Sequence, residues 1–172
     1  MGLFALIAVA AAQEVPAEQS AQGSNIPAYR AKGYKGSVSL TSLGLYWEGV
    51  ETSHGYMFND KVYLGAGAGL LIGTIYDAHP ALRAFADFQA YWLPRKSTLT
   101  TKVRAGYLRH FYGEDDMFEG TLTLGWSWGI ASYGISLDAG MSALVPPGNF
   151  LVAGVNQTKF SLAPVISLSF EF

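Results

Sequence analysis

Around position 53, three side chains have the chemistry for nucleophilic catalysis. Glu51, Ser53 and His54 place an acid, a hydroxyl and an imidazole within four positions, and such a set can activate a serine nucleophile. Neighbouring side chains on an extended strand point to opposite faces, so Ser53 and His54 would not meet without a bulge. The spacing therefore predicts structural strand residues here, and we assign no catalytic residue.

A second cluster, His110, Glu114, Asp115 and Asp116, combines an imidazole with three carboxylates. Grouped carboxylates favour hard cations such as Ca²⁺, but this spacing matches no calcium-binding loop. We interpret the cluster as a solvated acidic loop, a weak candidate for cation binding. We expect no metal and no cofactor.

Charged residues are sparse on the polar side of several alternating segments: Lys35, Arg83, Asp87, Lys102, Arg104, Glu119, Asp138 and Lys159. Charges placed inside a narrow barrel must be paired, because an isolated buried charge costs several kcal/mol. We predict a salt-bridged network that blocks any wide channel, formed by Arg83, Asp87, Lys102, Arg104, Glu119 and Asp138. The glycines at 65, 67 and 69 would let bulky interior neighbours such as Phe85 or Arg104 approach the wall.

The elements that position these residues are strands with strict alternation. From Phe160 to Phe172 every second residue is apolar or proline, and the intervening residues are mostly small or polar, which is typical of a strand with one apolar face. The same pattern predicts eight strands, over 34–48, 51–58, 62–72, 82–92, 102–107, 118–128, 135–143 and 160–172. The first would carry a β-bulge near Thr41, where its apolar phase slips.

Short turns at 58–61, 93–97 and 129–132 alternate with connections at 47–50, 76–81, 112–117 and 145–157. Short turns on one side and longer loops on the other are typical of outer-membrane barrels. We therefore predict an all-β fold, an eight-stranded antiparallel transmembrane β-barrel with up-and-down meander order.

A soluble barrel would also alternate, but its outer face would be rich in charges. The polar phase here carries too few charges for a solvated exterior, so we predict that the apolar face points outward into lipid. The aromatic residues group near the two predicted barrel ends, as expected for interfacial girdles. One group is Tyr34, Tyr56, Phe58, Trp92, Trp126, Trp128, Tyr133, Phe170 and Phe172, and the other is Tyr46, Trp47, Tyr107, Phe111, Tyr112, Phe118 and Phe160.

The composition excludes several other classes. There is no cysteine among the 172 residues, which excludes disulfides and thiolate chemistry. The net charge of −2, with no basic stripe, predicts no nucleic-acid partner. Residues 1–12 resemble a cleavable signal peptide, although the usual positive start is missing. Residues 13–33 read as a flexible periplasmic tail in which only Tyr29 would dock, and residues 34–172 as the barrel.

Three segments carry a resemblance to a known family: Thr52 to Asn59, Val62 to Gly69, and Ala84 to Phe88. They resemble the small eight-stranded outer-membrane β-barrel proteins of Gram-negative bacteria. The final residues, Phe170 and Phe172, are similar to the signal that the barrel-assembly machinery reads. The resemblance implies an integral outer-membrane location with both termini in the periplasm. It also implies contact with membrane lipid and lipopolysaccharide, and with assembly machinery and periplasmic chaperones during biogenesis.

The resemblance implies no settled activity, so three function classes stay open. The first, which we favour, is a structural or surface-interaction protein serving envelope integrity or adhesion. The second is a lipid-modifying enzyme of the outer leaflet, although the His-x-Ser arrangement of barrel-type lipid A deacylases is missing. This class would gain if Ser53, His110 and an acid met at the outer rim. The third is a narrow pore or a carrier for a small apolar ligand.

Overall fold

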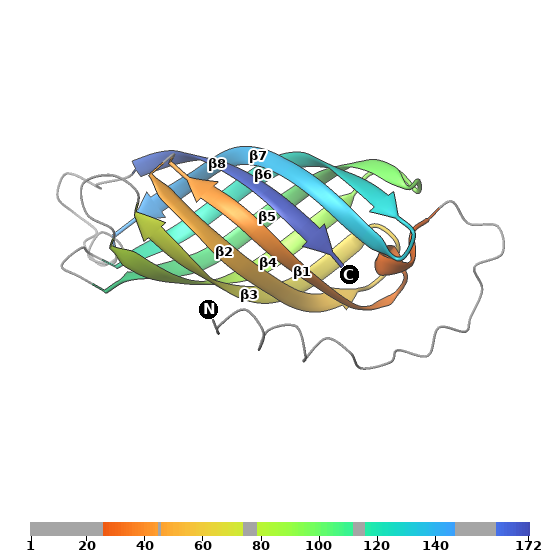
Figure 1. The fold of residues 1–172 in the computed structure, drawn as a ribbon, viewed down its shortest axis with the longest axis horizontal. Coiled ribbons are helices and arrows are strands. Elements are labelled where there is room, and N and C mark those ends of the chain that lie inside the picture. The colour runs from red at the N-terminus through yellow and green to blue at the C-terminus, as the bar shows by residue number, and fades with distance from the viewer. Residues whose placement is uncertain (1–25, 45, 74–78, 112–115, 147–160) are drawn as a thin grey trace, which may run out of the picture.

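The computed structural model describes residues 26–44, 46–73, 79–111, 116–146 and 161–172. Within these ranges, eight antiparallel strands form a closed barrel in which each strand pairs with the next and β8 pairs with β1 (Figure 1). The strands are β1 (Gly33–Leu43), β2 (Trp47–Met57), β3 (Val62–Gly73), β4 (Pro80–Tyr91), β5 (Ser97–His110), β6 (Met117–Ile130), β7 (Tyr133–Val145) and β8 (Ser161–Glu171). The predicted eight-stranded meander barrel is confirmed.

Alternation along each strand decides which side chains face the lumen. In β8, Ala163, Val165, Ser167, Ser169 and Glu171 are buried, and the intervening residues are exposed. In β3 the apolar residues at 64, 66, 68, 70 and 72 are exposed, as the sequence pattern predicted, and the glycines lie on the inner face. A period of two therefore sets the inner and outer faces of the barrel wall.

The predicted strand from Tyr34 to Glu48 is wrong, because the chain reverses within it. β1 ends at Leu43, Gly44 has a φ of 68°, and β2 begins at Trp47. The pairing runs without interruption from Gly33 with Met57 to Leu43 with Trp47, so this pair contains no bulge. The apparent phase slip arises because Leu43 and Trp47 face inward, where the inner face becomes apolar. Glycine permits the turn between them through its left-handed conformation.

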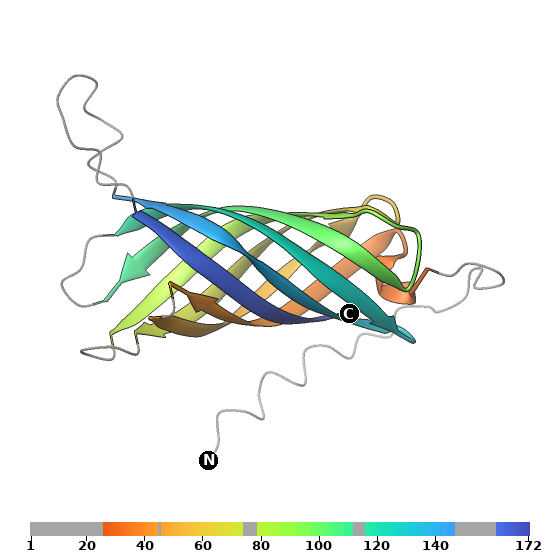
Figure 2. The same ribbon diagram turned by 90° about the horizontal axis from the view of Figure 1, so that it is seen from above.

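The two ends of the barrel differ in their connections. Residues 58–61, 92–96 and 131–132 join strands at one end, which we call the short-turn end. The connections at the other end, called the loop end, span 44–46, 74–79, 111–116 and 146–160. Both views place the short 3-10 helix η1 (Ala28–Arg30) and the C-terminus toward the short-turn end (Figures 1 and 2). No helix in the described ranges is long and apolar enough to cross a membrane.

The predicted N-terminal segments are described only in part. The signal peptide over 1–12 and most of the tail over 13–33 lie outside the described residues. From Ile26 onward the chain is described, and Tyr29 and Arg30 are buried against the barrel. The last part of the predicted tail is thus an ordered element of the fold, because both side chains are held by contacts set out below.

Candidate functional site

The outer face of the barrel is apolar and the inner face is polar. Among the described residues, 31 large hydrophobic side chains are exposed, whereas the buried set contains 24 polar or charged residues and 11 hydrophobic ones. A water-soluble protein has the opposite arrangement, and a monomer rarely exposes a contiguous apolar patch of more than a few hundred Å². The outer wall is therefore the largest candidate interaction surface on the molecule.

Full charges are confined to one margin of this surface. On the outward positions of the described strands, the ionised side chains are Glu48 and Arg109. Glu48 is the second residue of β2 and Arg109 the penultimate residue of β5, so both lie at the loop end. Between the two ends, the outer face is a band without full charge, carried by strands of 11 to 14 residues.

Aromatic side chains border this band at the short-turn end. Tyr34, Tyr56, Phe58, Trp92, Trp126, Trp128, Tyr133 and Phe170 are all exposed there. Some of these rings pack against each other: Tyr133 and Phe170 stack with ring centroids 5.3 Å apart. The indole N–H of Trp92 donates to Thr101 at 2.9 Å. The indole N–H of Trp92 is therefore satisfied while the face of its ring stays exposed.

The aromatic border at the loop end is sparser. Tyr46, Phe111 and Phe118 are exposed there, and Tyr107 lies 5.4 Å from Phe118 between ring centroids. Trp47 was predicted to belong to this border, which is wrong. It points inward and its ring lies 5.0 Å from that of His110, because β2 begins earlier than predicted and Trp47 takes an inner position. Tyr112 and Phe160 lie outside the described residues.

Two arginines organise the middle of the lumen. Arg83 on β4 forms ion pairs with Glu51 on β2 and Glu119 on β6. Arg104 on β5 pairs with the second oxygen of Glu51 at 2.8 Å and with Asp87 at 3.5 Å. We call these five residues the Arg83 network. Because its members come from β2, β4, β5 and β6, the network ties separate parts of the wall together across the lumen.

An aromatic ring contacts both guanidinium groups. The ring centroid of Phe85 lies 5.3 Å from Cζ of Arg83 and 4.6 Å from Cζ of Arg104, within the range of cation–π attraction. The ring fits because residue 67 is glycine: a Cβ there would lie 2.6 Å from Cε2 of Phe85. The predicted role of this glycine, close approach of an interior neighbour, is confirmed for Phe85.

Further charges lie nearer the short-turn end. Lys102 donates to Asp138 at 2.6 Å and to Ser136 at 3.2 Å. Lys35 contacts Tyr91, Gln89 and Glu171, with the last two at 2.9 and 3.3 Å. Gln89 and Tyr91 each donate to Glu171 at 3.0 Å. We call Lys35, Gln89, Tyr91 and Glu171 the Lys35 cluster.

The buried charges balance. The described buried set contains five cations (Arg30, Lys35, Arg83, Lys102, Arg104) and five acids (Glu51, Asp87, Glu119, Asp138, Glu171). Every buried side-chain nitrogen or oxygen in the described residues has a hydrogen-bond partner. Because these buried groups are paired and hydrogen-bonded, the ten charged side chains can occupy a narrow interior.

The six charged residues predicted for the lumen, Arg83, Asp87, Lys102, Arg104, Glu119 and Asp138, are all buried in it. They fall into the Arg83 network and the Lys102–Asp138 pair. Sequence reasoning placed Lys35 on the polar side but left it, with Glu51 and Glu171, out of the predicted network. All three have inner positions by alternation, so correct phasing of β2 and extension of the network to β1 and β8 would have found them.

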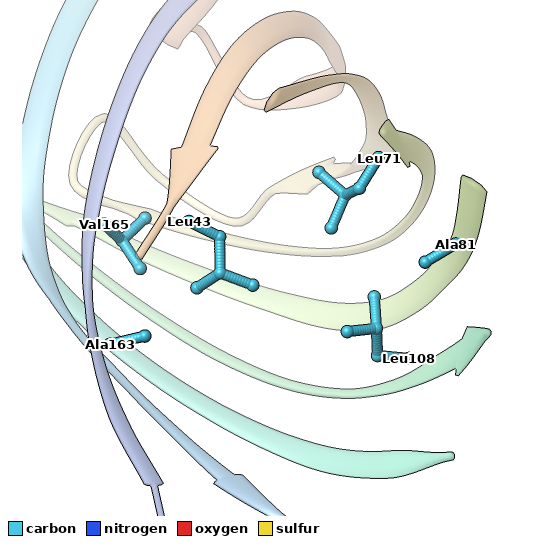
Figure 3. Close-up of a cluster of buried hydrophobic side chains, with 6 residues drawn as sticks. All are labelled: Leu43, Leu71, Ala81, Leu108, Ala163 and Val165. Atoms are coloured by element: carbon cyan, nitrogen blue, oxygen red, sulfur yellow. The ribbon is translucent and has the colours of Figure 1, made fainter. Parts of the chain in front are cut away.

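The loop end of the lumen is closed by apolar side chains. Figure 3 shows six of them projecting inward from the surrounding strands: Leu43, Leu71, Ala81, Leu108, Ala163 and Val165. Trp47, Met117 and Leu144 pack against this group. We call the six residues the apolar layer. Because several members are almost fully buried, the layer separates the Arg83 network from the loop end.

The candidate catalytic residues Ser53, His54 and His110 do not come together in the fold. Glu51 and Ser53 face the lumen, where Ser53 pairs with the hydroxyl of Tyr63 at 2.8 Å. His54 faces outward, and its ring nitrogens contact Tyr34 at 2.6 Å and Thr52 at 2.8 Å. His110 packs against Trp47, and Ser53 lies six residues further along β2, a separation of about 20 Å at the rise of an antiparallel strand.

The predicted acidic loop is likewise divided. His110 is buried and turned inward, whereas Asp116 accepts a hydrogen bond from Tyr107 at 2.5 Å. Glu114 and Asp115 lie outside the described residues. In the described ranges, no group of three or more potential ligands converges on a metal position.

Comparisons with known proteins show similarity in structure but not in sequence. No family model matches the chain, and no curated protein matches it. The crystal structure of Neisserial surface protein A is similar to this chain with a TM-score of 0.49 and 12% sequence identity, over 81% of this chain and 92% of the other. The barrel architecture described above rests on the strand pairing of the chain itself.

Proposed function

We propose that this chain is an integral outer-membrane β-barrel of a Gram-negative bacterium, with a structural or surface-interaction role in envelope integrity or adhesion. The observation that carries the proposal is the inverted distribution of polarity, with 31 exposed large hydrophobic residues around a polar interior. An outer face of this kind is costly in water and favourable in hydrocarbon. Lipid and lipopolysaccharide would be its contacts.

The dimensions of the wall support this location. A spanning strand needs about 9 to 11 residues when tilted by about 45°, and the eight strands have 11 to 14. The charge-free band is bordered at both ends by exposed aromatic residues, as interfacial girdles require. In this assignment the short-turn end faces the periplasm, and both termini are periplasmic.

The filled lumen supports a structural role over transport. The Arg83 network, the Lys102–Asp138 pair and the Lys35 cluster occupy the interior, and the apolar layer closes the loop end. A side-chain-filled lumen is the expected state for eight strands. A wide pore would require these paired charges to separate, which costs several kcal/mol for each pair.

Electrical recording tests this role directly. Purified monomer folded into planar bilayers is expected to give no large, stable conductance, and liposomes containing it are expected not to swell in small solutes. A large, stable conductance would overturn the closed-lumen assignment. Mass spectrometry of lipid A from cells with and without the protein tests the alternative of lipid modification, for which an altered acylation pattern would be required.

Location is tested by fractionation of a Gram-negative host that expresses the full chain. We expect the protein in the outer-membrane fraction, resistant to extraction at alkaline pH. Recovery in the soluble periplasmic fraction would contradict the proposal. In that case the exposed apolar band would need another explanation.

The C-terminus supplies a separate test of assembly. Phe172 exchanges two backbone hydrogen bonds with Gly36, at 2.7 and 2.9 Å, and Phe170 pairs with Ile135 across the β7–β8 ladder. We predict that deleting residues 170–172 sharply lowers outer-membrane levels. The deletion also removes Glu171, so the double variant Phe170→Ala/Phe172→Ala is compared with Glu171→Gln. Loss in the first but not the second indicates an assembly signal, and normal levels of the truncated chain would contradict it.

A further inference from the structure

Residues 27–30 occupy a recess at the short-turn end of the barrel, and we call this recess the seat. The backbone hydrogen bonds of this segment, from Arg30 to Pro27 and from Ala31 to Ala28, are internal to it. Its attachment to the barrel comes through side chains. Only Ala31 and Lys32, both exposed, connect it to β1. The segment can therefore leave the barrel without breaking a strand pair.

The guanidinium of Arg30 is the strongest contact in this seat. It is fully buried and donates to the backbone carbonyls of Asp60, Leu93 and Arg95 at distances from 2.7 to 3.1 Å. Its Cζ lies 4.5 Å from the ring centroid of Tyr91. The three carbonyls belong to two different short turns. A planar fork of donors is well matched to such a cradle, and a lysine ammonium is not.

Tyr29 inserts into the lumen beside Arg30. Its hydroxyl pairs with Ser127 at 2.8 Å, and Ser127 donates to Glu171 of the Lys35 cluster at 3.1 Å. Its ring meets the ring of Tyr91 edge to face, with centroids 6.5 Å apart. The ring thus lies between the Lys35 cluster and the short-turn end.

The barrel wall is recessed for this segment. A Cβ at position 134 would lie 2.5 Å from Cζ of Tyr29, and a Cβ at position 129 would collide with Pro27. Both glycines flank the third short turn, which joins β6 and β7. The segment therefore contacts two short turns and the strand ends that flank the third, and the shape of the wall fits it.

We propose that residues 27–30 are a removable plug, and that the short-turn end of the barrel is a binding site for a tyrosine–arginine dipeptide filled by this chain's own segment. The ligand class is set by the seat: a guanidinium for the carbonyl cradle and a neutral phenol for Ser127. Release would open the Lys35 cluster to water while the eight-stranded ladder stays intact. The proposal concerns the folded barrel and can be tested in detergent micelles, so it does not depend on the proposed location.

Protease protection at Arg30 tests the plug in the full-length protein. Arg30 is the first basic residue of the sequence, so an arginine-specific protease that cuts there releases a single fragment. We expect folded wild-type protein to resist this cut. Gly134→Ala, which places a methyl group where the Tyr29 ring lies, is expected to accelerate it at least tenfold.

The matched control is Gly120→Ala, because a Cβ at this outward position meets nothing within 4 Å. Circular dichroism verifies that both variants keep the barrel. Cleavage at Arg30 that is equally fast in wild type and Gly134→Ala would overturn the proposal. So would protection in both variants, since the seat would then not depend on the recess at position 134.

A second arm tests the seat as a binding site. The double variant Tyr29→Ala/Arg30→Ala empties the seat but leaves its walls unchanged. Binding of a labelled peptide with the sequence of residues 26–31 is measured by fluorescence anisotropy. We expect the peptide to bind the double variant at least tenfold more tightly than it binds the wild-type protein. A peptide with Phe-Lys in place of Tyr-Arg is expected to bind the double variant weakly. Equal binding of the peptide to wild type and double variant would contradict a separable ligand.

Discussion

The two ends of the lumen are closed by different means. At the loop end, the apolar layer is made of strand residues, so its side chains cannot leave unless the wall itself opens. At the short-turn end, closure comes from Tyr29 and Arg30, which precede the first strand and contact the barrel through side chains. One closure is part of the wall and the other is a separate element placed against it. The difference predicts that the two ends respond differently to substitution.

The largest effect on stability is expected in the Arg83 network, which lies between the two closed ends of the lumen. Arg83→Met leaves Glu119 buried without its cation and removes one partner of Glu51. The free energy of unfolding should fall by about 3–5 kcal/mol, measured by urea titration in lipid vesicles with circular dichroism. Arg83→Met/Glu119→Leu removes both partners and should recover much of this loss. A single variant as stable as wild type would show that the pair contributes little.

At the loop end, Leu108→Ala should lower the free energy of unfolding by about 2–5 kcal/mol, the usual cost of truncating a fully buried leucine. The same urea titration measures it. Cleavage at Arg30 should stay as slow as in wild type, because distant, independent sites do not couple. Faster cleavage at Arg30 in this variant would mean that the two closures act as one unit.

The smallest effect is expected at the short-turn end. Tyr29→Phe removes the hydrogen bond to Ser127 and should weaken seating of the segment by about 1 kcal/mol. Burial, with a smaller contribution from the negative charge of Glu171, raises the pKa of Tyr29 from 10.0 to about 12. The folded protein favours the neutral phenol of Tyr29. The stabilisation that this phenol gives to the bound segment is therefore complete below pH 10 and is lost as the pH rises through about 12.

Ultraviolet titration of phenolate absorbance measures this difference. Wild-type protein should contain one more late-titrating tyrosine than Tyr29→Phe. Titration of Tyr29 at its ordinary pKa would indicate that the ring is solvated rather than seated.

The contrast between the ends also explains what the sequence could predict. The six lumen charges, exemplified by Arg83 and Asp138, followed from alternation alone, because a period of two assigns each residue to a face. Glu51 was missed because the inner face becomes apolar at Leu43 and Trp47, which concealed the turn at Gly44 and left the phase of residues 51–58 ambiguous. Alternation assigns a face only where the inner residues are polar and the outer ones apolar.

Arg30 was beyond sequence reasoning for another reason. Its partners are backbone carbonyls at positions 60, 93 and 95, and any residue type supplies a carbonyl. No complementary charge marks the seat, and the segment has the composition of a solvated tail. Only the closed barrel brings the three turns together, so the site exists in the fold and has no signature in the chain.

The pairing of β1 with β8 has a consequence for the timing of folding. Gly36 and Phe172 are joined by two backbone hydrogen bonds, although 135 residues separate them in sequence. This contact needs the whole span from Gly36 to Phe172, so the barrel cannot close before Phe172 has been delivered. Contacts of such long range make folding slow, and an unclosed sheet leaves two edges open to wrong partners. Until β1 pairs with β8, the chain therefore depends on being held apart from its neighbours.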